Sequence, residues 1–156
     1  MKDYADAGLQ HKVPLYGSGF LTEGVLAAQG AAAEGIETTL HYADALDNPA
    51  NKKFREAFKK ATGRDADVYA VAGYDTVNVL AQALGKVKGD TGAGKELIAA
   101  LEATQLDSPR GPFRFSKAHN PVQDVYPRQV KGGREVVLGV AMKDAEDPAA
   151  GCKMGK

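Results

Sequence analysis

Apolar and polar residues alternate along the first part of the chain in patterns that predict helices and strands in turn. Residues 4–9 place apolar side chains on one helical face, and "VPLYG" at 13–17 predicts a short buried strand. The apolar positions of residues 20–29 fit a helix, although Gly24 weakens the pattern. "IETTLHY", residues 36–42, alternates with a period of two in a β-rich composition, which predicts a second strand.

The strongest helix prediction is "NPANKKFREAFKKATG", residues 48–63. Asn48 can cap the first turn, Pro49 suits the first helical position, and a glycine follows the last. Phe54 and Phe58 stand four residues apart and share one face, while basic residues cover the others. A solvated helix face explains this basic run better than DNA binding does, because the whole chain is neutral.

The remaining sequence predicts a strand, two helices and a β-hairpin. "DVYAVAGY" at 67–74 is typical of a strand, and helices follow over 74–87 and 95–105. Further on, "VYPRQV" and "EVVLGVA" flank two glycines, which indicates a hairpin. Pro127 predicts that the first hairpin strand lies at an edge or contains a bulge. Small and charged residues after Met142 predict a loose tail.

This order of elements predicts an α/β fold with a flavodoxin-like, mostly parallel sheet. The chain has 156 residues, enough for one domain with a real core. The charges of its 20 basic and 20 acidic side chains cancel. Because nucleic-acid-binding proteins usually carry a basic surplus, this balance argues weakly against a nucleic-acid partner. No apolar run approaches the length of a membrane span.

The single cysteine, Cys152, favours neither a disulfide nor a metal site. It cannot form an internal disulfide, and no other cysteine or histidine stands near enough to suggest zinc, so we expect an unpaired thiol and no cofactor. The start of the chain has no apolar signal-peptide core. "DYADAGLQ" is typical of the last turns of a helix that begins earlier, so we expect a fragment of a longer protein.

Gly17-Ser18-Gly19, between a predicted strand and a predicted helix, is the first candidate site. A dinucleotide fingerprint needs a glycine where Thr22 stands, and a serine hydrolase needs its glycines two residues away from the serine. The three histidines, including His41, have no partner that the sequence identifies. Two interpretations therefore stay open: backbone amides that bind a small ligand, or simply a tight turn.

Tyr69 and Tyr74 are the second candidate, because they flank the predicted start of a helix. Tyrosines in such a position can stack on a ligand ring and donate a hydroxyl to it. Taken alone, the two residues are explained better by packing in the core.

Taken together, four stretches resemble one family: "VPLYGSGF", "HYADALDNPANKKFREAFKKATG", "VYAVAGYDTV" and "SPRGPFRFSKAHNPVQDVYPRQV". They are similar to the periplasmic solute-binding proteins of ABC importers, of the leucine/isoleucine/valine-binding type, and within it to the branch that takes aromatic acids. The likeness runs from about Asp3 to about Met142. It implies a type I fold of two α/β lobes that close on a ligand, a periplasmic location, an ABC permease as partner and no catalysis.

The resemblance also implies how the chain is divided. Residues 1–42 and 122–142 would belong to the second lobe, residues 43–121 to part of the first, and residues 143–156 to the loose tail. The chain would then be the carboxyl-terminal portion of such a protein. Exposed sheet edges and apolar faces would make this portion prone to self-association.

Site residues follow from the resemblance position by position. Ser18, Gly19 and Phe20 match a wall of the ligand cleft, Tyr69 matches an aromatic ligand contact, and Tyr74 matches a tyrosine with weaker grounds for contact. Gly19 stands where amino-acid-binding members have an acidic residue, so the resemblance implies an aromatic acid rather than an amino acid.

Arg110 matches a position that we interpret as structural, tying loops together by guanidinium hydrogen bonds. Two alternatives to transport remain at this stage. One is a ligand-sensing domain of a receptor or regulator with the same fold, and the other is a small flavodoxin-like enzyme or cofactor protein.

Overall fold

The computed structural model describes residues 1–151, so Cys152 and its expected unpaired thiol lie outside the described residues. The secondary structure in chain order is α1 Lys2–Asp6, β1 Tyr16–Ser18, η1 Gly19–Leu21, α2 Leu26–Gln29, η2 Gly30–Ala33, β2 Glu37–Leu40, α3 Pro49–Thr62, α4 Val68–Lys86, α5 Gly94–Glu102, β3 Gln105–Ser108, β4 Gly111–Phe115, β5 Pro121–Lys131, β6 Arg134–Val137 and β7 Met142–Ala145. None of the helices in this described part is long and apolar enough to cross a membrane.

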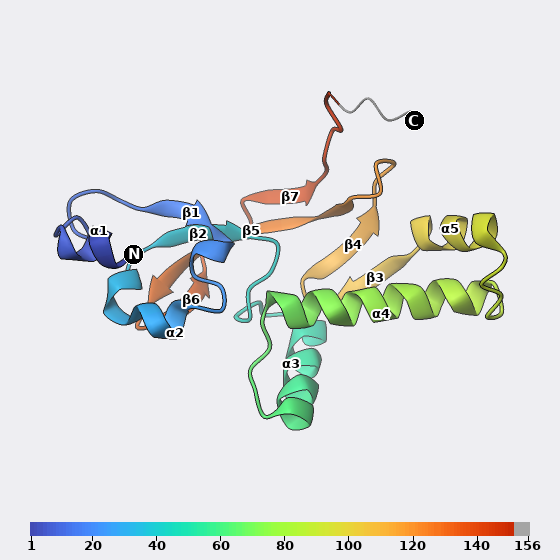
Figure 1. Ribbon diagram of the computed structural model, residues 1–156, viewed down its shortest axis with the longest axis horizontal. Coiled ribbons are helices and arrows are strands. Elements are labelled where there is room, and N and C mark those ends of the chain that lie inside the picture. The colour runs from blue at the N-terminus through green and yellow to red at the C-terminus, as the bar shows by residue number, and fades with distance from the viewer. Residues whose placement is uncertain (152–156) are drawn as a thin grey trace.

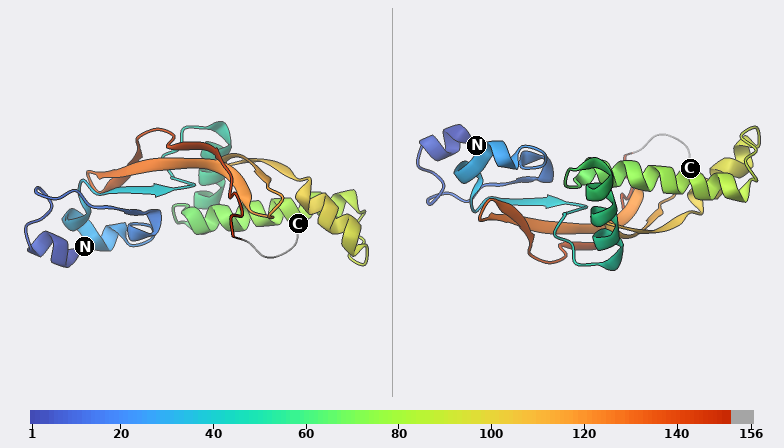
Figure 2. Two further views of the ribbon diagram at one scale, coloured as in Figure 1. Left: turned by 90° about the horizontal axis from the view of Figure 1, so that it is seen from above. Right: turned by 90° about the horizontal axis from the view of Figure 1, so that it is seen from below.

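The molecule is elongated, and the long strand β5 connects its two ends (Figure 1). At one end α1, β1, β2, α2 and β6 lie together, and at the other end α4 and α5 lie beside β3 and β4 (Figures 1 and 2). The strand order is β1-β2-β5-β4-β3, and β6 and β7 also pair with β5. The sheet therefore runs through both ends of the molecule.

The sheet contains less parallel pairing than the sequence analysis predicts. Among the described strands β1 and β2 pair in parallel, and the other five pairs are antiparallel. The α/β class is correct, but "mostly parallel" is wrong for this chain. Part of the reason is that residues 67–74, predicted as a strand, form the start of α4 instead.

α4 begins earlier than predicted because its first turn is capped and its apolar residues have helical spacing. The Asp67 carboxylate accepts a hydrogen bond from the Ala70 amide at 2.8 Å. Val68, Val71 and Asp75 are buried along one face of the helix. A run of valine and alanine fits a buried strand and a buried helix equally well, and here packing selects the helix.

The other predictions of local structure had mixed outcomes. α3 begins and ends as expected, with the Asn48 side chain accepting from the Asn51 amide at 2.8 Å and Gly63 in the left-handed conformation. The expected helix over residues 20–29 is interrupted, because Gly24 has a φ of +73° and separates η1 from α2. The tail is not loose at its start, since residues 143–145 belong to β7, which pairs with β5.

Pro127 lies in the central strand β5 rather than at an edge, so that part of the prediction is wrong. One side of the residue pairs with Thr39 of β2. On its other side β5 changes partner, from β7 at Val125 to β6 at Arg128. The missing N–H of the proline falls at this change of partner, where it interrupts neither ladder.

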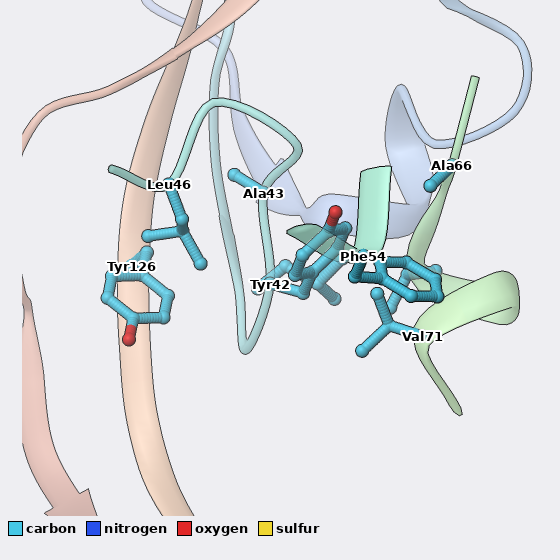
Figure 3. Packing of buried hydrophobic residues seen from close by; sticks show 9 residues of the cluster. Tyr42, Ala43, Leu46, Phe54, Ala66, Val71 and Tyr126 are labelled. Atoms are coloured by element: carbon cyan, nitrogen blue, oxygen red, sulfur yellow. The ribbon is translucent and has the colours of Figure 1, made fainter. Parts of the chain in front are cut away.

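The main core holds the end of β2 against α3, α4 and β5. Figure 3 shows this cluster, in which buried side chains from the segment after β2, from both helices and from β5 pack together: Leu40, Tyr42, Ala43, Leu46, Phe54, Ala66, Val68, Val71 and Tyr126. The Tyr42 hydroxyl donates to the Asn51 side-chain oxygen at 2.9 Å, which satisfies a buried polar group. The end of β2 is thereby fixed beside the start of α4.

Candidate functional site

The carboxyl ends of β1 and β2 lie side by side and mark the candidate site. The two strands are parallel, with Ser18 opposite Thr39. η1 follows β1 directly, and His41 follows the last residue of β2. Small ligands commonly bind at the carboxyl ends of parallel strands in open α/β sheets.

Gly19 must be a glycine because the turn lies directly against buried atoms. A Cβ at this position would stand 2.6 Å from the Nη2 atom of Arg128 and 2.6 Å from the Cβ of Leu40. Gly19 itself is buried, whereas Ser18 before it is exposed. The glycine therefore permits a close approach of the backbone to the sheet, which goes beyond the tight turn considered from sequence.

Phe20 and Tyr69 lie near each other although 49 positions separate them in the chain. Their ring centroids are 6.2 Å apart, with planes tilted by 35°. The two side chains are 54% and 60% exposed, respectively, which is high for large apolar groups. One ring comes from η1 and the other from the first turn of α4, so the pair spans the space between these elements.

Tyr74, the remaining predicted site residue, belongs to a different contact. Its ring centroid lies 4.8 Å from that of Phe54 on α3. The structure thus brings together Phe20 and Tyr69, with Ser18 and Gly19 immediately before Phe20, and gives Tyr74 a packing role between two helices.

Arg128 forms a buried network beneath the turn that the sequence analysis missed. Its side chain is 1% exposed, and Nη1 lies 2.9 Å from Glu23 and 2.6 Å from Glu135. Nη2 donates to the Gly19 carbonyl at 3.1 Å, and Nη1 also donates to the Tyr42 carbonyl at 3.3 Å. One guanidinium therefore fixes η1 relative to the residues that follow β2.

Glu23 extends this network to α4. One of its carboxylate oxygens accepts from Arg128, and the other accepts from the backbone N–H of Val68 at 3.0 Å. Val68 is the first residue of α4, where a negative charge also interacts favourably with the helix dipole. Both oxygens of Glu23 are thus occupied, and the bond to Val68 positions Tyr69 relative to Phe20.

Glu135 completes the acidic part of the network. The Thr22 hydroxyl donates to its carboxylate. Burial raises the pKa of Glu135, and the bond from Thr22 and the charge of Arg128 oppose this shift. The cluster therefore holds two carboxylates around one guanidinium.

His41 is a neutral side chain beside this network. Burial lowers the pKa of its imidazole from 6.5 to about 4, and the positive charges of Arg110 and Arg128 add to this effect. The sequence contained no signal for this residue beyond its position after a predicted strand. A neutral imidazole at this place can both donate and accept a hydrogen bond.

The pKa of His41 makes stability depend on pH. The unfolded chain takes up a proton near pH 6.5, whereas the folded state resists protonation until about pH 4. The contribution of His41 to the free energy of unfolding is therefore complete above pH 6.5. It falls by about 2 kcal/mol, with screening by water allowed for, as the pH drops towards 4. Urea unfolding of wild type and His41→Gln across this range should show a smaller loss in the variant. His11→Gln, which changes an exposed histidine, is the control, and a His41→Gln curve parallel to the wild type would contradict the assignment.

Arg110 has the structural position expected from sequence. Its Nε donates to Oδ2 of Asp75 at 2.8 Å, its Nη2 lies 2.7 Å from the same oxygen as an ion pair, and its Nη1 donates to the Gln123 side-chain oxygen at 2.9 Å. The guanidinium therefore ties the turn between β3 and β4 to α4 and β5. Asp75 is buried as well, and burial raises the pKa of its carboxyl.

A polar surface pocket of about 410 Å³ lies beside the network. Glu23, Glu135, Asp44 and Arg55 contribute to its lining, and none of the five residues predicted from sequence, all within the described part of the chain, lines it. Within residues 1–151 no group of three or more histidine, cysteine, aspartate or glutamate side chains could hold a metal ion.

The comparisons with known proteins match this chain to one family. The family model described as "Periplasmic binding protein" matches residues 1–135. A "Leu/Ile/Val-binding protein homolog 6" from Brucella abortus is 36% identical over 135 residues, covering 83% of this chain and 34% of the relative.

Solved structures of similar proteins agree with this match. A solute-binding protein of an ABC transporter from R. palustris, in complex with benzoate, has a TM-score of 0.90 and 49% identity, covering 98% of this chain and 42% of that one. A second, from Rhodopseudomonas palustris BisB5 in complex with 3,4-dihydroxy benzoic acid, has a TM-score of 0.84 and 31% identity, covering 96% and 42%. This chain thus spans about a third of the curated relative and about two fifths of these solved chains.

Proposed function

Because this chain belongs to the periplasmic binding protein family, we propose that it forms part of an ABC-transporter solute-binding protein that captures a small aromatic acid. The observation that supports this most directly is the exposed pair Phe20 and Tyr69 at the carboxyl end of β1. The protein would work in the periplasm and deliver its solute to an ABC permease. No covalent bond would be made or broken.

Each residue of the proposed site has a role that its chemistry allows. Phe20 and Tyr69 would contact the ring of the solute, and Ser18 and the adjacent backbone amides would donate hydrogen bonds to its polar groups. His41, neutral near pH 7, would add a donor or an acceptor at the end of β2. Tyr74 stays a weaker member of the site, because its ring packs on Phe54.

The absence of an acidic side chain at Gly19 favours a solute without an ammonium group. Gly19 has no side chain, and the nearby Glu23 carboxylate already pairs with Arg128 and accepts a hydrogen bond from the Val68 amide. An ammonium group bound here would lack a charge-assisted hydrogen bond of about 1.5–3 kcal/mol. A benzoate-type acid has no such requirement, and relatives in complex with benzoate and 3,4-dihydroxy benzoic acid support this choice.

Capture would occur by closure of two lobes around the solute. Residues 1–42 and 122–142 would belong to one lobe and residues 43–121 to the other. Phe20 lies in the first of these groups and Tyr69 in the second, so a solute ring that packs against both side chains would contact both groups. Such a ligand stabilises the closed state because it binds that state more tightly than the open one.

The proposal is tested by titrating the chain with benzoate and following backbone amide signals by NMR. We expect weak binding, with a dissociation constant of about a millimolar or more, since the matched relatives are more than twice as long and this chain supplies only part of the contacts. The shifts should centre on Ser18–Phe20 and Tyr69, and Phe20→Ala should reduce them strongly.

The control for this titration is Ile98→Ala, which removes an exposed apolar side chain on α5 far from the site and should leave the shifts unchanged. Leucine serves as the competing ligand. Larger shifts at Ser18–Phe20 with leucine than with benzoate would contradict the proposal. Micromolar affinity for benzoate would contradict the expected weakness of binding by this chain.

A further inference from the structure

The hydrogen bond from the Val68 amide to Glu23 joins two parts of the chain that have few other polar contacts. Glu23 follows η1 at one end of the molecule, and Val68 begins α4, which runs towards the other end (Figure 1). Within the described part of the chain, it is the only hydrogen bond between residues 1–41 and residues 43–121. The rings of Phe20 and Tyr69 lie close by, because Phe20 stands three positions before Glu23 and Tyr69 directly follows Val68.

The Glu23 carboxylate is held rigidly on its own side of this contact. Its side chain is 9% exposed, and one oxygen accepts from Nη1 of Arg128 at 2.9 Å. Arg128 is itself fixed, since it also donates to the Thr38 hydroxyl at 3.2 Å and to the Gly19 carbonyl at 3.1 Å. These four residues all belong to the group 1–42 and 122–142. That group therefore presents the other oxygen of Glu23 to α4 in a fixed position.

The Val68 amide needs an acceptor from outside its own helix. The first N–H groups of a helix have no partner within it. In α4 the side chain of Asp67 accepts from the Ala70 amide, and its carbonyl accepts from the Val71 amide. Val68 is 3% exposed and bonds to Glu23 instead. The start of α4 thus takes one of its acceptors from the opposite side of the proposed site.

We propose that Glu23 is a positioning residue of the site, whose bond to the Val68 amide forms when the two lobes close and breaks when they open. The inference rests on the proposed function, in which residues 1–42 and 122–142 form one lobe and residues 43–121 belong to the other. The relative in complex with benzoate aligns with 98% of this chain at a TM-score of 0.90. The two groups therefore lie here much as they do in that solute-bound protein.

This bond and the solute would favour the same state. A solute that contacts Phe20 and Tyr69 binds the closed arrangement more tightly, and the bond from Val68 to Glu23 exists only in that arrangement. Each therefore strengthens the other, as linkage requires. A hydrogen bond to a charged group is strong enough to change such an equilibrium about tenfold or more.

Hydrogen exchange followed by NMR tests the bond in the chain without solute. In the wild type the Val68 amide should exchange at least about tenfold more slowly than the Tyr69 amide, after correction for neighbouring residues, because residues 1–151 supply no acceptor for Tyr69. Glu23→Ala should remove most of this protection. Glu135→Ala is the matched control, since it also leaves Arg128 with one carboxylate, and should keep the Val68 amide protected.

Distances between spin labels test whether the bond holds the two groups together. In a Cys152→Ser background, labels at Val13→Cys and Val77→Cys, both exposed, report on one group each. The background protein should give a narrow distance distribution. Adding Glu23→Ala should broaden it towards longer distances, whereas adding Glu135→Ala should leave it narrow.

Two results would overturn the role of Glu23. One is a wild-type Val68 amide that exchanges as fast as that of Tyr69, which decides the question even if Glu23→Ala does not fold. The other is a Glu23→Ala variant that matches Glu135→Ala in both exchange and distances, since the effect would then come from Arg128. Neither measurement contains solute, so a failure to bind benzoate would contradict the proposed function and would not be confused with a failure of this inference.

Discussion

Replacing Arg128 by methionine is expected to lower the free energy of unfolding by about 3–5 kcal/mol. The side chain is 1% exposed and lies between two carboxylates, Glu23 and Glu135. Methionine fills a similar volume but leaves both carboxylates in the interior without a positive partner. The loss is therefore mainly the cost of two uncompensated negative charges.

The pH dependence of this variant follows from the same charges. Burial already raises the pKa of Glu135, and without Arg128 the positive charge that opposes this shift is gone, so the pKa of Glu135 rises further above its value in the unfolded chain. A group whose pKa is raised on folding contributes stability at low pH and loses it as the pH rises. The difference in free energy of unfolding between the wild type and Arg128→Met should therefore be smallest in acid. It should grow as the pH rises above the ordinary pKa of glutamate.

Urea unfolding measures the effect, and a matched variant separates charge from shape. The triple variant Arg128→Met, Glu23→Gln, Glu135→Gln removes all three charges and should recover a large part of the loss. Recovery cannot be complete, because the bonds from Arg128 to the Gly19 and Tyr42 carbonyls are lost in both variants. A triple variant no more stable than the single one would show that shape, rather than charge, explains the network.

Sequence patterns predicted the local features of this fold well wherever the determining residues stand close together. The start and end of α3 follow from Asn48, Pro49 and Gly63, whose effects act within one turn. The same reasoning failed at the start of α4, because valine and alanine fit a strand or a helix and the surrounding packing decides between them.

The candidate site depended on contacts between distant positions, which a single sequence does not contain. Glu23 and Arg128 are 105 positions apart, and nothing in their neighbours indicates that they pair. Phe20 was predicted only through the resemblance to a family, and Tyr69 was a candidate from its position beside a predicted helix before the resemblance strengthened it; neither pattern indicated that the two rings lie together. Glu23 was visible only as the first carboxylate after the turn, and its partners became clear from the structure.

Replacing Asp75 by alanine is the second change with a large expected effect, again about 3–5 kcal/mol. Oδ2 of Asp75 accepts two hydrogen bonds at 2.8 Å, from the Ser108 hydroxyl and from Nε of Arg110, and Nη2 of Arg110 lies 2.7 Å from the same oxygen as an ion pair. Alanine removes these contacts at once and leaves the guanidinium of Arg110 buried, with its side chain 8% exposed. Among the described residues it keeps a hydrogen bond to Gln123 and a position over the Phe113 ring. The turn between β3 and β4 would also lose its connection to α4.

Two companion variants identify which part of this loss is due to charge. Ser108→Ala removes one neutral donor to Asp75 and a weak acceptor for the Arg110 amide, and should cost about 1 kcal/mol, since Arg110 still pairs with Oδ2 of Asp75. The double variant Asp75→Ala, Arg110→Met removes the pair and should be clearly more stable than Asp75→Ala alone, because no charge is left in the interior. If instead Asp75→Ala costs less than Ser108→Ala in urea unfolding, Arg110 is not held by this carboxylate. In that case the connection from α4 to the β3–β4 turn must come from the apolar contacts among Val79, Leu106 and Phe113.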